Sequence, residues 1–220
     1  MPNEVVERRL YQEGNKNLKI VPIDFSSNAE GTFGTAETFE GLVSIDITFS
    51  RTVTNTAADD VSDYLRRESQ EKGEGTITLI GITYAQYQKL YNNIVDSNGV
   101  IVMGDRNQSK KVGVSFTNTS NYVDNTGASV SSENMFFMPS VVFSLPNITS
   151  TTLSEDDSGE VSIAIPVTAT ARRYTKKNST DGYYTRAKLN SVNNADIYAS
   201  VKAKGYYIPD ETVSTTNEEL

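Results

Sequence analysis

The residue types that most enzymes use for catalysis near neutral pH are missing from this chain. Its 220 residues include no histidine and no cysteine. Histidine is the usual general base and the commonest metal ligand, and a cysteine thiolate is a frequent nucleophile and zinc ligand. The chemistry that remains is that of carboxylates, which can bind calcium or act in pairs on a glycosidic bond.

Three aspartates gather at one place in the chain, at Asp59, Asp60 and Asp63. A calcium loop needs acidic residues at alternate positions, then a glycine and a distal glutamate, and this stretch lacks that order. Carboxylate pairs elsewhere arise by chance in a chain with 28 acidic residues. Phosphate-binding glycine loops, zinc spacings and the glycines of a hydrolase elbow are absent. We therefore expect no enzyme activity, no cofactor and no bound metal.

The net charge of -8 opposes binding to a phosphate backbone, so a conventional DNA-binding protein is not expected. The absence of cysteine suits a reducing cytoplasm. No apolar run approaches the roughly 20 residues that a membrane helix needs, so no contact with a membrane is expected.

The aspartates lie in the connection between two strands that each have one apolar and one polar face. In residues 41–50 and 74–81, apolar and polar side chains alternate with the period of a sheet. The two strands are therefore expected to pair as a hairpin with a polar face that is not part of the core. The candidates for this face are Ser44, Asp46, Thr48, Ser50, Thr76 and Thr78.

The connection itself, residues 51–73, is far longer than a hairpin requires. Hairpins usually close in two to five residues, and loops beyond roughly 12 to 15 residues tend to be functional or disordered. Apolar residues three and four apart predict a helical turn over residues 60–66. We expect this loop to dock on another protein, the alternative being a flexible loop without a role. The docking residues would be Asp59, Asp60, Val61, Asp63, Tyr64, Leu65, Arg66 and Arg67.

The rest of the chain predicts a mainly β fold, a β-sandwich or half-barrel in a single domain with one flanking helix. The helix is expected over residues 83–95, where Thr83 and Gln86 have the spacing of a capping box and a tyrosine stripe faces the core. Residues 1–16 are expected to form a terminal arm, 118–133 an exposed loop, and 209–220 a mobile acidic tail. Further strands are expected at 17–23, 100–103 paired with 111–118, 135–145 with a bulge or a sheet edge at Pro139, 160–174 bent at Pro166, 183–189 and near 197–207.

The order of a strand, a long loop with an acidic pair, a second strand and a helix resembles the major tail proteins of long-tailed bacteriophages. The segments that carry the resemblance are 41–49, 58–60, 75–79 and 84–90, and it is clearest over residues 17–103. The resemblance implies a tail tube subunit that assembles into rings, usually hexameric, which stack into a hollow tube for DNA. It also implies that the long loop reaches the adjacent ring and that the termini contact neighbours.

The resemblance further implies the location and the partners of the protein. It would be a virion protein of the tail, made in the host bacterial cytoplasm. Its partners would be copies of itself, the tape measure protein, and tail-terminator or baseplate proteins. An acidic and uncharged polar channel would let DNA pass without specific binding, because lysine and arginine contacts create affinity for phosphate. The polar face of the two strands is then the candidate lumen surface.

Two other functions remain open at this stage. Another phage structural component, such as a baseplate or decoration protein, would share this composition. A carbohydrate-binding β-sandwich would need exposed aromatic side chains on a concave face, which the 12 tyrosines could provide.

Overall fold

The computed structural model describes residues 8–27, 30–58, 61–92, 96–102, 109–123, 128–146, 162–175 and 181–209. The structure is mainly β, with 59% strand and 11% helix, and its sheets are antiparallel. It is β-sandwich-like, and the described strands do not close into a barrel. The predicted fold class is confirmed, and the described residues contain two helices where one was expected.

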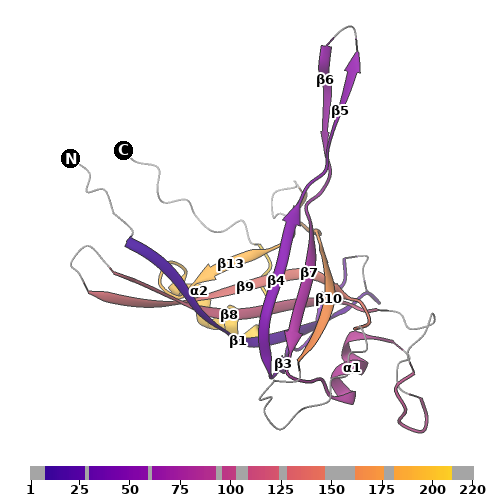
Figure 1. Cartoon of the computed structure of the whole chain (residues 1–220), viewed down its shortest axis with the longest axis vertical. Coiled ribbons are helices and arrows are strands. Elements are labelled where there is room, and N and C mark those ends of the chain that lie inside the picture. The colour runs from indigo at the N-terminus through magenta and orange to yellow at the C-terminus, as the bar shows by residue number, and fades with distance from the viewer. Residues whose placement is uncertain are drawn as a thin grey trace, which may run out of the picture.

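One large sheet holds most of the strands, in the order β2, β1, β8, β9, β10, β7, β4, with β3 on β1 and β13 on β9 (Figure 1). Two small sheets, β5 with β6 and β11 with β12, stand apart from it. The strands are β1 (Arg8–Asp24), β2 (Thr32–Phe33), β3 (Glu37–Phe39), β4 (Leu42–Ser50), β5 (Val53–Ala58), β6 (Val61–Glu68), β7 (Lys72–Leu79), β8 (Lys111–Val123), β9 (Ser129–Phe143), β10 (Ile163–Thr170), β11 (Arg172–Thr175), β12 (Asp181–Tyr184) and β13 (Ala187–Asn190); the helices are α1 (Tyr84–Leu90) and α2 (Ala195–Lys204).

The core lies where β4, β7 and β10 cross over β1, β8 and β9 (Figure 1). The register aligns Ile45, Ile77 and Ile165 in one row across three strands. Ile77 and Ile165 are fully buried in a cluster that also contains residues of β1, β8, β9 and α1. The period-2 alternation seen in the sequence therefore separates a buried face from a polar one.

Helix α1 closes one end of this core and carries the predicted capping box. The Gln86 backbone N–H donates to Thr83 Oγ1 at 3.3 Å, and the Thr83 N–H donates to Gln86 Oε1 at 2.8 Å. The helix ends at Leu90, earlier than expected, because Tyr91 forms a β-bridge with Ser109. Tyr91 is buried, as is most of the described stripe, but Tyr84 is 62% exposed, so its expected place in the core is wrong.

Helix α2 occupies the region where an alternating strand near residues 197–207 was predicted, and that prediction is wrong. Alanine favours helix at three of its ten positions. Tyr198 and Val201, three residues apart, pack on β9 and β13 from one helix face. Gly205 ends the helix in the left-handed conformation, with φ of 79°. The Lys19 ammonium donates to the Lys202 carbonyl at 2.6 Å and so binds the negative end of the helix dipole.

Two regions expected to lack strands belong to the large sheet. β1 begins at Arg8, so much of the expected arm 1–16 is a strand, and the expected loop 118–133 is largely the adjoining ends of β8 and β9. Both predictions were wrong because they were based on the polar residues of these segments. In the structure such residues form hydrogen bonds with one another across neighbouring strands. Asn134 Nδ2 donates to Asn118 Oδ1 at 3.2 Å and to Ser120 Oγ at 2.5 Å. Because buried polar groups with partners cost little, asparagine and serine are tolerated inside this sheet.

Other strand predictions also need correction. Residues 100–102, the described part of the strand predicted over 100–103, form no strand paired with β8, which lies between β1 and β9. The described part of the long strand predicted over 160–174 is divided at Ala171 into β10 and β11. Pro166 lies within β10, where its carbonyl accepts from the Ser144 N–H at 2.9 Å, and the bend predicted there stays a prediction. The strand 183–189 is divided between β12 and β13. The bulge at Pro139 is confirmed by the register shift between β8 and β9. Within the described part of the chain, no helix is long and apolar enough to cross a membrane.

Candidate assembly site

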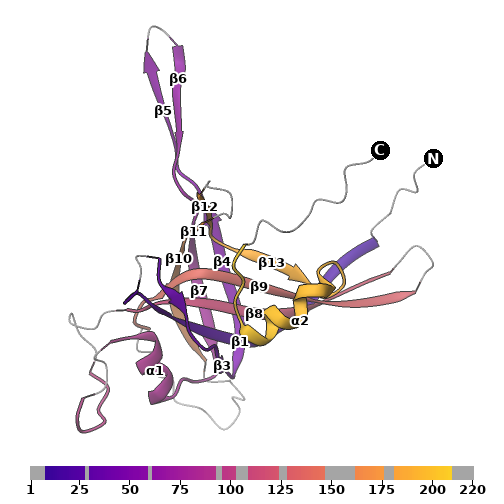
Figure 2. The ribbon, with the colours of Figure 1, turned by 180° about the vertical axis from the view of Figure 1, so that it is seen from behind.

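The long connection between β4 and β7 is itself a hairpin that leaves the body of the molecule. β4 and β7 pair antiparallel as predicted, and β5 and β6 continue beyond them with Thr54 opposite Arg67 and Thr56 opposite Leu65. Figures 1 and 2 show this β5–β6 hairpin projecting away from the sheets. The insertion is therefore available for contact with another molecule.

The helical turn predicted over residues 60–66 is wrong, because β6 runs from Val61 to Glu68. Pairing with the threonine-rich β5 supplies cross-strand hydrogen bonds that a single helical turn could not match. Among the predicted docking residues, Leu65, Arg66 and Arg67 are exposed. Asp59 and Asp60 lie outside the described residues. The backbones of Val61, Asp63 and Tyr64 belong to β6, but their side chains are not described.

The hairpin joins the body through a short neck between residues 51–52 and 68–69. The Ser69 N–H donates to the Thr52 carbonyl at 2.9 Å, and the Thr52 N–H donates to Ser69 Oγ at 2.9 Å. Arg51 Nη1 lies 3.9 Å from Glu68 Oε2. This ion pair is exposed and adds little stability, so the two backbone-anchored hydrogen bonds define where the hairpin starts.

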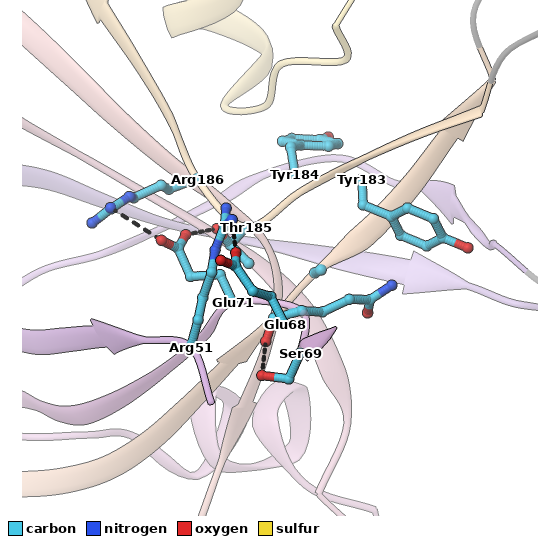
Figure 3. A pocket seen from close by; sticks show the side chains of 10 residues that line it. Arg51, Glu68, Ser69, Glu71, Tyr183, Tyr184, Thr185 and Arg186 are labelled. Atoms are coloured by element: carbon cyan, nitrogen blue, oxygen red, sulfur yellow. Dashed lines mark hydrogen bonds and ion pairs between the residues drawn. The ribbon is translucent and has the colours of Figure 1, made fainter. Parts of the chain in front are cut away.

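A side-chain cluster ties this neck to the C-terminal half of the chain (Figure 3). Thr185 Oγ1 donates to Glu71 Oε2, and Arg186 Nη2 lies 3.4 Å from Glu71 Oε1. The Arg186 guanidinium also lies 4.2 Å from the centre of the Phe49 ring. These contacts border an open cavity of about 560 Å³. We call this set, Phe49, Glu71, Thr185 and Arg186, the neck cluster.

Sequence reasoning missed the neck cluster entirely. Glu71 and Thr185 lie 114 residues apart, and neither belongs to a recognisable motif. No local pattern marked it, since the strand predicted over residues 183–189 runs through Thr185, where the structure has a break between β12 and β13.

The six polar residues predicted for one face lie together on that face. Ser44 pairs with Thr78 and Asp46 with Thr76, while Thr48 and Ser50 continue along β4 toward the hairpin. The four residues of β4 are exposed, and the two threonines of β7 are half-buried. Helix α1 packs against the opposite, apolar side of these strands.

The same face is wider than the sequence analysis proposed. Lys72 and Glu74 of β7 continue it and form an ion pair with each other. Thr168 and Thr170 of β10 pair with them and add a third strand. In the sequence Thr168 and Thr170 alternate with Val167 and Ala169, so the two threonines share one face of β10. The result is a surface of mostly uncharged polar groups across β4, β7 and β10, which we call the polar face.

Several of the groups with perturbed pKa values are tyrosines. Burial raises the pKa of Tyr91, whose hydroxyl donates to the Ser144 carbonyl at 2.8 Å. Burial also raises the pKa of Tyr184. No three acidic side chains among the described residues come together in a way that could hold a metal ion.

Comparison with protein families gives one match over nearly the whole chain. A family model described as phage tail tube protein matches residues 3–216. The match includes the hairpin, the polar face, the neck cluster and both helices. No curated protein matches the chain.

Proposed function

Because the chain belongs to the phage tail tube protein family, we propose that it self-assembles into hexameric rings, which stack into a tube that conducts phage DNA. The family identifies a structural protein of the virion tail that assembles into a tube with other tail components. Proteins of this family are typically not enzymes. The proposal adds the ring number, the contacts between rings and the surface that faces DNA.

The projecting β5–β6 hairpin is the observation that carries the proposal. A two-stranded ribbon that leaves its own sheet cannot bury its apolar residues within the subunit, and Leu65 is 42% exposed. Contact with a copy in the next ring would bury such residues and would hold the rings together. Asp59 to Arg67 would thus be the tip and one flank of the stacking arm.

The polar face supports the assignment of the channel wall. Ser44, Asp46, Thr48 and Ser50 present hydroxyls and a carboxylate, and Thr76 and Thr78 add two more hydroxyls. The described ammonium group on this face, that of Lys72, is paired with Glu74. Since binding to DNA depends on lysine and arginine contacts with phosphate, this surface would let DNA slide past without specific binding.

The free edge of β4 supports ring closure. β4 is the last strand in the sheet order, so among the described strands it has a neighbour on one side only. An unpaired edge of this length invites pairing with another chain. Pairing with a strand of the adjacent subunit would continue the sheet, and repeated rotation by the same operation closes a ring.

The remaining partners follow from the place of a tube in the virion. The tape measure protein would lie inside the tube, and the tail-terminator and baseplate proteins would contact its two ends. The subunit would be made in the cytoplasm of the host bacterium before assembly.

Excision of the hairpin tests the proposal. Residues 53–68 would be replaced by an Asn-Gly turn between Thr52 and Ser69, whose backbones are already hydrogen-bonded. We expect a folded subunit that forms no tubes in negative-stain microscopy at rising concentration, while the full chain forms rings and tubes. Tubes of normal length from the excised variant would disprove the stacking role. Isolated particles of the full chain at every concentration would disprove self-assembly itself.

A further inference from the structure

The β4–β7 ladder and the β5–β6 ladder are joined out of register by one residue. Lys72 pairs with Ser50 at the end of the first ladder, and the Ser69 N–H donates to the Thr52 carbonyl at the start of the second. Arg51 therefore stands opposite two residues of the other strand. Two residues opposite one define a β-bulge, which interrupts the ladder and bends the strand. The neck is thus the point at which the ribbon changes direction.

Few contacts beyond the neck hold the hairpin in one direction. Among the described strands, β5 and β6 pair with each other and with no third strand. The ion pairs of Arg51 and Arg66 with Glu68 stay within the hairpin and the neck. The open cavity of about 560 Å³, lined by Gln70 of the neck and Tyr183 of β12, leaves room beside the neck. A two-stranded ribbon attached in this way will swing about its bulge unless the bulge itself is held.

Glu71, the second residue of the bulge, is held by the body of the molecule. Figure 3 shows its carboxylate between Thr185 and Arg186. Thr185 is buried and its hydroxyl donates to Glu71 Oε2, while Arg186 Nη2 lies 3.4 Å from Glu71 Oε1. Residues 185–186 lead directly into β13, which pairs with β9 of the large sheet. The carboxylate therefore connects the bulge to the large sheet.

Arg186 is in turn held by the other strand of the ribbon. Its guanidinium carbon lies 4.2 Å from the centre of the Phe49 ring, within the range of a cation–π contact. Phe49 pairs with Gly73, and a Cβ on Gly73 would lie 2.7 Å from Cε1 of the ring. The absence of a side chain at position 73 thus allows the ring its position. Through Glu71 and Phe49, both strands at the neck contact the same guanidinium.

We propose that Glu71 is a positioning residue: by tying the bulge to Thr185 and Arg186, it fixes the direction in which the β5–β6 hairpin leaves the subunit. This role belongs to the single subunit and needs no contact between copies. Its consequence for assembly rests on the proposed function. An arm that already points in one direction loses less conformational freedom when it makes a contact, so the contact forms at a lower concentration.

Spin labels test the proposal in the single subunit, because the chain has no cysteine of its own. Leu65→Cys on β6 and Val192→Cys on the turn before α2 are exposed positions for a pair of labels. Double electron-electron resonance gives the distribution of distances between the labels, measured below the concentration at which tubes grow. We expect one narrow distribution for the parent chain. We expect a distribution about twice as wide for Glu71→Ala, because the bulge is then free to bend.

Two further variants keep the test valid if Glu71→Ala folds poorly. Glu71→Gln retains an oxygen that accepts from the Thr185 hydroxyl, so its distribution should be closer to that of the parent than to that of Glu71→Ala. Arg186→Ala removes an exposed partner of the same carboxylate and should also widen the distribution. The matched control is Glu74→Ala, which removes an exposed carboxylate paired with Lys72 and should leave the distribution unchanged.

A reference pair of labels separates positioning from general stability. Val192→Cys with Tyr84→Cys on α1 reports on the body of the subunit, and Glu71→Ala should leave this distribution unchanged. Equal widening of both pairs would reduce Glu71 to a structural residue. A narrow distribution for the Leu65 pair in both Glu71→Ala and Arg186→Ala would show that the hairpin keeps its direction without this carboxylate. Either result would overturn the proposal.

Tube growth distinguishes this inference from the proposed function. If the hairpin stacks rings, Glu71→Ala should raise the concentration needed for tube growth by roughly three- to tenfold, because each contact must then order a loose arm. Normal growth of a variant with a widened distribution would leave the positioning role intact and count against the stacking role. A subunit that never forms tubes would refute the proposed function alone, since the label distances are measured without assembly.

Discussion

Single side chains determine how the hairpin is held at its base. Glu71 is the residue that links the neck to the C-terminal half, and its side chain is 18% exposed. Thr185, which donates to it, is 6% exposed. Removing the partner of a polar group this well buried lowers the free energy of unfolding more than breaking a surface ion pair does.

We therefore expect Glu71→Ala to lower the free energy of unfolding by about 1 to 3 kcal/mol, because the buried Thr185 hydroxyl loses its acceptor. Urea unfolding followed by circular dichroism measures this change. The matched control is Glu74→Ala, in which a 66% exposed carboxylate loses its ion pair with Lys72. We expect that loss to cost at most about 0.5 kcal/mol. Equal unfolding midpoints for the two variants would show that the neck cluster adds no stability.

Tyr91 gives the protein a pH dependence at alkaline pH. Burial keeps its hydroxyl neutral in the folded chain, so its folded pKa lies above the unfolded value of about 10. Between these two values the unfolded state binds fewer protons than the folded state, so the free energy of unfolding falls as pH rises. The stabilisation is complete below pH of about 10 and is lost progressively above it.

Urea unfolding at neutral and strongly alkaline pH checks this expectation. Tyr91→Phe should cost about 1 kcal/mol at neutral pH through loss of the bond to Ser144. The same variant should lose less stability than the parent on going to alkaline pH. A parent protein whose unfolding midpoint does not change with alkalinity would contradict the assignment.

At the scale of elements, the approach of β4 to β7 depends on one glycine. A Cβ placed on Gly75 would lie 1.8 Å from the Asp46 carbonyl oxygen of β4. A real Cβ cannot occupy that space, so a side chain there must push the two strands apart. The hairpin and the polar face both depend on this strand pair.

Gly75→Ala is therefore expected to destabilise the fold by about 3 kcal/mol or more, because overpacking against a backbone cannot be relieved by a rotamer change. The control is Gly81→Ala, where no atom lies within 4 Å of the added Cβ. Thermal unfolding of the two variants measures the difference. A melting temperature for Gly75→Ala as high as that of Gly81→Ala would mean that β4 and β7 lie further apart than described.

At the scale of the whole molecule, the hairpin, most of the polar face and the free edge of β4 arise from the same pair of strands. β4 and β7 carry the polar residues along their length and continue into the β5–β6 hairpin. In the proposed tube, this part of the subunit would then line the channel, pair with the neighbour that closes the ring, and contact the next ring.

The channel assignment predicts what a charge change on this surface does to DNA. Tubes of Asp46→Lys are expected to retain a DNA duplex at low salt and release it as salt rises, because the added ammonium groups line the channel. Tubes of the parent chain should retain much less. Asp196→Lys, an equal charge change on the exposed start of α2, is the control. Co-sedimentation of DNA with tubes measures the effect, and equal retention by both variants would place Asp46 outside the channel.

The sequence by itself determined the features that depend on local periodicity and residue chemistry. Alternation along residues 41–50 and 74–81 predicted which side chains leave the core, because successive side chains of any strand point to opposite faces. The capping box of Thr83 and Gln86 predicted the start of α1, since both partners lie within one helical turn.

Only the tertiary structure decided features that depend on residues far apart in the chain. Asn118 and Asn134 can lie in buried strands because the Asn134 amide donates a hydrogen bond to the Asn118 side chain. Neither segment reveals this partner by its own sequence. Ile197 to Tyr207 alternates like a strand, yet contact of Tyr198 and Val201 with β9 and β13 selects a helix over residues 195–204. The position of Glu71 beside Thr185 likewise depends on the path of the whole chain. The local pattern of residues determines which faces a segment could bury. The free energy of burial against distant partners then determines which of these faces is buried in the fold.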